Sequence, residues 1–149
     1  MASTDLNGDG LDDLIVGTPQ YFDYGEQIGG AVFVFFSKTS GTFRQSSKNE
    51  SFSDRGYSDF KLLTGPRDSA FGSAVTSLGD ANIDNYGDFC VGAPNIQHKS
   101  GNSGSIFMFN GQKTWSSSPS QVITADDIAK EDPVQYFGRS LKETSSKII

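Results

Sequence analysis

Residues 5–19 read DLNGDGLDDLIVGTP, an acidic loop with two glycines that runs directly into a β-branched apolar segment. Oxygen-bearing side chains recur at alternate positions of the loop and again at its end. This spacing turns them toward the centre of a tight loop, where calcium takes about six to eight oxygens. The predicted ligands are the side chains of Asp5, Asn7, Asp9 and Asp13 and the backbone carbonyl of Leu11. The stretch therefore predicts a calcium loop.

Two other interpretations of this loop are open. The helix-loop-helix calcium site begins with the same spacing, but it requires a bidentate Glu at its twelfth position and flanking helices. The twelfth residue here is Val16, inside a run of residues that predicts a strand. The other alternative is a polar surface turn without metal, because Asp, Asn and Gly are common turn residues.

The same pattern occurs again at residues 80–94, which read DANIDNYGDFCVGAP. Asn85 stands where the first loop has Gly10, which is tolerable because Asn enters the left-handed region more readily than most residues. The predicted ligands of this second loop are the side chains of Asp80, Asn82, Asp84 and Asp88 and the carbonyl of Tyr86. Two loops with matching ligand positions favour metal binding over simple turns, so we predict two calcium sites.

Composition narrows the possible functions. The chain has 149 residues, of which 35% are hydrophobic, enough for the packed core of one domain. Its net charge of −6 argues against a nucleic-acid surface, which requires basic patches. Cys90 lies in an apolar run and is predicted to be an inert buried residue. His98 stands in a polar turn without a nucleophile or carboxylate beside it, so no catalytic role is predicted.

The rest of the chain also repeats. The pair Phe71-Gly72 recurs as Phe137-Gly138, the segment at residues 30–35 recurs at residues 104–109, and residues 61–64 correspond to residues 121–124. Each unit contains four predicted strands, and no segment has helical periodicity. We therefore predict an all-β fold, a partial β-propeller with two blades of four antiparallel strands and a calcium loop between strands one and two of each blade.

Three units follow from this alignment. We expect residues 1–70 to form a repeat that lacks its first strand, because only Ala2-Ser3-Thr4 precede the first loop. Residues 71–136 should form a complete repeat, and residues 137–149 the first strand of a truncated third. Two blades leave sheet faces and strand edges uncovered. We therefore expect self-association, with the terminal strand of one copy completing the first blade of another.

At this point the residues resemble a known family. The pair Phe71-Gly72, the segment Val91-Gly92-Ala93-Pro94 and the Asp-x-Asn-x-Asp loops are similar to the FG-GAP repeats of the integrin α-subunit head. The resemblance covers nearly the whole chain and places it around blades five and six, with the start of blade seven. It implies that the two loops bind Ca²⁺ on the propeller face away from ligand.

The resemblance also implies an extracellular, membrane-anchored adhesion receptor that pairs with an integrin β-subunit and binds matrix or cell-surface ligands. This segment would contribute no ligand contact, and its role would be structural and non-catalytic. Asn49-Glu50-Ser51 is a glycosylation sequon, which has meaning in a secreted protein. The alternative function is an accessory FG-GAP propeller of a secreted enzyme such as a phospholipase, whose catalytic domain would lie elsewhere in the chain.

Overall fold

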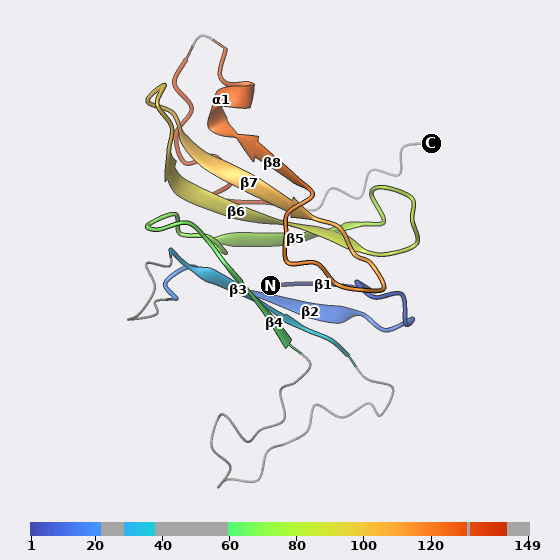
Figure 1. The fold of residues 1–149 in the computed structure, drawn as a ribbon. Helices are drawn as coiled ribbons and strands as arrows, with labels where there is room; N and C mark the ends of the chain where they lie inside the picture. The colour runs from blue at the N-terminus through green and yellow to red at the C-terminus, as the bar shows by residue number, and fades with distance from the viewer. Residues whose placement is uncertain (22–28, 38–59, 131, 143–149) are drawn as a thin grey trace, which may run out of the picture.

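The computed structural model describes residues 1–21, 29–37, 60–130 and 132–142, which form two four-stranded antiparallel sheets in the orders β1-β2-β3-β4 and β5-β6-β7-β8 (Figure 1). The predicted all-β fold is thus confirmed. The elements are β1 (Ala2–Thr4), β2 (Asp13–Thr18), β3 (Ala31–Phe35), β4 (Phe60–Thr64), β5 (Ala74–Gly79), β6 (Asp88–Gln97), β7 (Ser103–Phe109), β8 (Gln121–Thr124) and the single-turn helix α1 (Ala125–Ile128).

The first sheet has two apolar faces. One face carries Ile15 of β2, which pairs with Val34 of β3, and both side chains are fully buried. The other face carries the rings of Phe33, Phe35 and Phe60, whose centroids lie 5.9 to 6.2 Å apart. β-branched and aromatic side chains of this kind pack well on a pleated surface, which explains why both runs form strands.

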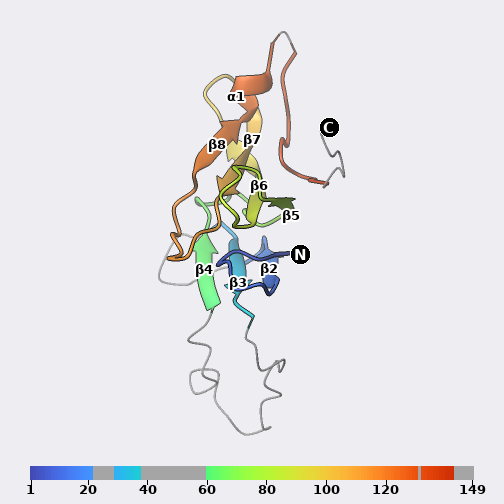
Figure 2. The ribbon, with the colours of Figure 1, turned by 90° about the vertical axis from the view of Figure 1, so that its right-hand side faces the viewer.

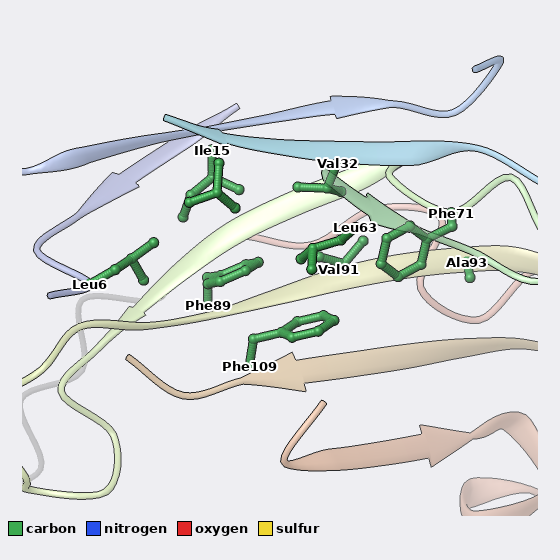
Figure 3. Close-up of a cluster of buried hydrophobic side chains, with 10 residues drawn as sticks. Leu6, Ile15, Val32, Leu63, Phe71, Phe89, Val91, Ala93 and Phe109 are labelled. Atoms are coloured by element: carbon green, nitrogen blue, oxygen red, sulfur yellow. The ribbon is translucent and has the colours of Figure 1, made fainter. Parts of the chain in front are cut away.

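The second sheet lies face to face with the first (Figure 2). The first seven residues of β6 are all buried, which fits a strand covered on both sides. Figure 3 shows the core side chains between the two sheets. The core cluster contains Leu6, Ile15, Val32, Val34, Leu63, Phe71, Phe89, Val91, Ala93 and Phe109.

A Phe-Gly segment follows each sheet and crosses back onto it. Phe71 forms an isolated parallel bridge with Gly30, and Phe137 forms the equivalent bridge with Gly104. Phe71 is also buried between the sheets, where its ring centroid lies 5.3 Å from that of Phe107 in β7. Each Phe-Gly segment therefore belongs to one repeat by sequence but closes the sheet of the repeat before it, as expected for adjoining blades.

Two strand predictions differ from the structure of the described residues. The first repeat does not lack its first strand, because Ala2–Thr4 forms β1 and pairs with β2. Three residues suffice, since each finds a partner on β2. In the described part of residues 137–149, Phe137 makes only an isolated bridge and no strand forms. The first sheet is therefore already four-stranded, and the main reason for expecting strand exchange between copies is gone.

Three further outcomes concern smaller features. The sequence pattern does not predict α1, whose turn is stabilised by a capping box between Thr124 and Asp127. No helix among the described residues is long and apolar enough to cross a membrane. The sequon at Asn49 lies outside the described residues, so its glycosylation stays a prediction.

Candidate metal loops

Both acidic loops connect the first strand of a sheet to the second. The first loop, residues 5–12, joins β1 to β2, and the second loop, residues 80–87, joins β5 to β6. Since β1 and β5 are in contact and the two strand pairs point the same way, both loops emerge at the same end of the stacked sheets (Figure 1). The predicted placement between strands one and two is what the structure shows.

In the first loop, side-chain oxygens turn inward onto the backbone amides of the loop itself. The carboxylate of Asp5 accepts hydrogen bonds from three amides, of Gly8 at 2.8 Å, Asp9 at 3.2 Å and Gly10 at 2.8 Å. The Asn7 side-chain oxygen accepts from the Asp9 amide at 3.0 Å, and Asp9 accepts from the Leu11 amide at 2.9 Å. Alternate side chains therefore converge on the loop interior, as their spacing predicts.

The second loop repeats most of this ladder. Asp80 accepts from the amides of Asp84 at 2.9 Å and Asn85 at 2.9 Å. The third and fifth positions make the same bonds as in the first loop, including the amide nitrogen of the Asn side chain donating to the carboxylate two residues on. These bonds are Asn82 Oδ1 to the Asp84 amide at 3.1 Å, Asp84 Oδ1 to the Tyr86 amide at 2.9 Å, and Asn82 Nδ2 to Asp84 Oδ2 at 2.8 Å.

The closing carboxylate of each loop is buried beneath it. Asp13 is 0% exposed and accepts from the amides of Leu6 and Ser37, at 3.0 and 2.8 Å. Burial raises the pKa of Asp13 from 3.8 to about 6, an effect that its two amide donors oppose and its acidic neighbours reinforce. Burial also raises the pKa of Asp88, which is 2% exposed. A buried carboxylate is costly unless a positive charge or several donors compensate it.

The donor set of each loop suits a hard cation. The predicted ligands of each loop are three carboxylates, one side-chain amide oxygen and one backbone carbonyl, the ligand types that calcium prefers. Among the described residues, however, no three His, Cys, Asp or Glu side chains are gathered into a ready-made metal cluster. The loop carboxylates point at amides, but an ionised carboxylate has about four acceptor positions, so these bonds leave capacity for an ion. The chemistry fits calcium, and its binding stays a prediction.

Two backbone groups that the sequence pattern does not predict hold the closing carboxylates. They are the amides of Ser37 and Gly111, the second of which donates to Asp88 at 3.0 Å. Each lies two residues after the third strand of its sheet, since β3 ends at Phe35 and β7 at Phe109. The repeat alignment could have identified the pair, because the two positions are equivalent although their residue types differ.

Cys90 and His98 lie outside the loops, and their contacts indicate structural roles. Cys90 is buried as predicted, and burial raises the pKa of its thiol to about 11, which keeps it protonated and unreactive. The His98 Nε2 lies 3.0 Å from the Gly104 carbonyl oxygen and 3.2 Å from the Ser105 hydroxyl oxygen. Ser105 is only 2% exposed, so this contact ties the turn between β6 and β7 rather than presenting a nucleophile to solvent.

Known proteins resemble both the loop region and the chain as a whole. The FG-GAP repeat family matches residues 1–35. Integrin alpha-6 from Homo sapiens is 36% identical and integrin alpha-6 from Gallus gallus 34% identical, each over 142 residues that cover 95% of this chain. Integrin alpha-3 from Mus musculus is 42% identical over 94 residues, 63% of this chain. The matched segments make up only 8 to 11% of the length of these relatives.

Proposed function

Because the chain belongs to the FG-GAP repeat proteins and corresponds to a segment of the integrin α-subunit head, we propose that it is a calcium-stabilised structural part of an adhesion receptor. In this role it catalyses no reaction. It supplies two adjoining blades of the propeller, and each blade is held at its first turn by a bound Ca²⁺. The ion would be liganded by the oxygens of Asp5, Asn7, Asp9, Leu11 and Asp13 in one loop and of Asp80, Asn82, Asp84, Tyr86 and Asp88 in the other.

The observation that carries this proposal is the duplicated hydrogen-bond ladder. In both loops the first, third and fifth side chains fold inward onto amides, while the ninth is buried below them. Polar surface turns without a common function have no reason to share all four positions. A bound divalent ion gives one, since it would compensate the acidic side chains that otherwise repel one another.

The wider role rests on the relatives. The whole receptor would lie at the outer face of the plasma membrane, pair with an integrin β-subunit and bind matrix or cell-surface ligands. In that assembly the present segment would shape and stiffen the propeller rather than contact the ligand. Self-association of this chain alone, through sheet faces that further blades would cover, is a corollary of the same proposal. Light scattering at high concentration tests it, and a monomer mass would contradict it.

Thermal unfolding with and without calcium tests the proposed role. A site that binds the folded chain alone contributes about 2.7 kcal/mol when free calcium is one hundred times the dissociation constant. We expect chelation to lower Tm by several degrees and Asp13→Ala to remove most of the effect of one site. Calorimetry with magnesium in place of calcium would show whether the stabilisation is selective.

Asp12→Ala is the matched control. Asp12 adjoins the closing ligand and carries the same charge, but its exposed side chain is not a predicted ligand. Its loss should leave the calcium-dependent part of Tm unchanged. The proposal is contradicted if chelator leaves the melting curve of the unsubstituted chain where it was.

A further inference from the structure

The two acidic loops touch each other. The Gly87 amide of the second loop donates to the Asp5 carbonyl oxygen of the first at 2.6 Å. The Tyr86 ring lies against Gly8, where an added Cβ would approach ring carbon Cε1 to 2.7 Å. One predicted ligand of each loop, Asp5 and Tyr86, is therefore part of the contact between them.

A third segment, residues 110–112, joins the two loops from below. The Gly111 amide donates to the buried Asp88 carboxylate at 3.0 Å, and the next amide, that of Gln112, donates to the Leu6 carbonyl oxygen at 2.8 Å. Leu6 is 0% exposed, and its own amide donates to Asp13 at 3.0 Å. Consecutive peptide groups thus connect the closing carboxylate of one loop to the closing carboxylate of the other.

The junction around Gly111 is tightly packed. A Cβ on Gly111 would lie 2.3 Å from the Gly87 carbonyl oxygen, 2.8 Å from the Leu6 carbonyl oxygen and 2.9 Å from the Tyr86 Cβ. Gly111 and Gly87 are both buried. Because buried hydrogen bonds are costly to leave unmade, a shift in one loop has to be followed by the other.

We propose that the two calcium loops are energetically coupled through the Gly111 junction, so that an ion in one loop raises the affinity of the other. The inference rests on the proposed calcium binding and adds its regulation. The first ion to bind orders the junction, and the second ion then binds a loop whose ordering cost has already been met. Such coupling is reciprocal, so each ion must strengthen the other by the same factor.

Calorimetric titration of the whole chain with CaCl₂ tests the coupling. Asp9→Asn disables the first loop and Asp84→Asn the second, and both side chains are exposed, so neither change disturbs the core. We expect the remaining loop of each variant to bind calcium about fivefold or more weakly than in the unsubstituted chain, by the same factor in both. Asp12→Asn, an exposed acid that is not a predicted ligand, should change neither affinity.

When the two single-loop substitutions are repeated in a Gly111→Ala background, the coupling factor should fall toward one, because each affinity is then compared within the same background. If Gly111→Ala does not fold, Tyr86→Leu tests the other contact between the loops, because it removes the ring that lies against Gly8, and it should also lower the coupling factor. Gly101→Ala is the control glycine, since an added Cβ there meets nothing within 4 Å and its cost comes only from the left-handed backbone at φ 89°, far from both loops.

Unchanged affinities in the single-loop variants, or unequal factors, would overturn the coupling and leave calcium binding intact. Coupling that survives Gly111→Ala would overturn the route through Gly111, and coupling that survives Tyr86→Leu would overturn any part played by the Tyr86 contact with Gly8. Failure of the unsubstituted chain to bind calcium would instead overturn the proposed function itself.

Discussion

The two acidic loops follow the same backbone path with different residues. In the first loop the two left-handed positions are Gly8, at φ 75°, and Gly10, at φ 84°. In the second loop they are Ile83, at φ 63°, and Asn85, at φ 70°. Glycine accepts this conformation readily, Asn accepts it at small cost, and a β-branched residue rarely adopts it. The second loop therefore reaches the same shape under strain.

Packing of the Ile83 side chain does not compensate for this strain. Its side chain is 87% exposed, so apolar burial does not offset the cost of its conformation. The two loops share their acidic positions and the backbone amides that donate hydrogen bonds to these side chains. The comparison indicates that inward-facing carboxylates and amide oxygens determine the path of the loop, and that glycine only makes the path easier.

The largest expected effect comes from the closing carboxylates, where the two loops should behave alike. Asp13→Ala and Asp88→Ala each remove a predicted calcium ligand and leave two amides without their acceptor. Loss of the ion and of these buried bonds should together lower the free energy of unfolding by about 3 to 5 kcal/mol in calcium.

Urea unfolding in calcium and in chelator measures these contributions. In chelator the cost should be smaller, because each substitution also removes a buried charge. A clear inequality between the two variants in calcium would break the equivalence of the loops.

The next largest effect concerns the glycines that let each Phe-Gly segment cross its sheet. A Cβ on Gly92 would lie 1.8 Å from the Gly138 carbonyl oxygen, and a Cβ on Gly17 would lie 2.2 Å from the Gly72 carbonyl oxygen. Because the obstacle is backbone in both cases, we expect Gly92→Ala and Gly17→Ala each to cost about 1 to 3 kcal/mol, with the larger loss at Gly92. Denaturant midpoints of both variants test this expectation. Midpoints equal to that of the unsubstituted chain would contradict it.

A smaller pair of effects has opposite signs in the two loops. Gly10→Ala meets no atom within 4 Å, so its cost should be only that of the left-handed conformation, about 1 to 2 kcal/mol. Ile83→Gly removes the corresponding strain and should stabilise the chain by about 1 kcal/mol, less what glycine adds to the entropy of the unfolded state. Calorimetric Tm values distinguish these outcomes, and a destabilising Ile83→Gly would show that Ile83 makes a contact worth its strain.

The smallest effect is expected at Asn85. Asn85→Gly should change stability by no more than a few tenths of a kcal/mol, because Asn already tolerates the left-handed region. The useful measurement is its calcium affinity beside that of Ile83→Gly. If strain limits the second loop, Ile83→Gly should improve calcium binding while Asn85→Gly leaves it nearly unchanged.

The sequence predicted what depends on local pattern. Alternation of acidic residues located both loops, and the apolar runs located β3 and β7, because these signals lie within a few neighbouring residues. It missed β1, since three residues carry no periodicity and pair only because β2 lies beside them. It also missed the amides of Ser37 and Gly111, which reach the closing carboxylates across 24 and 23 residues through backbone groups that every residue type possesses.

The contact between the two loops could not be predicted from the sequence either. Gly87 and Asp5 meet only because two sheets stack with their first strands together, and stacking is a property of the assembled fold. The sequence reflects this contact only through Gly87 and Gly111, which stand at positions where a Cβ would collide with neighbouring atoms. The steric reason for glycine at these two positions is visible only in the three-dimensional structure.

Whether each acidic loop holds a calcium ion is best decided by a crystal structure of the chain grown in millimolar calcium. We expect one ion in each loop, with the aspartate oxygens and the carbonyls of Leu11 and Tyr86 at about 2.3 to 2.6 Å from it. Loops without an ion at that calcium concentration, with the same carboxylates bonded only to their own amides, would contradict it.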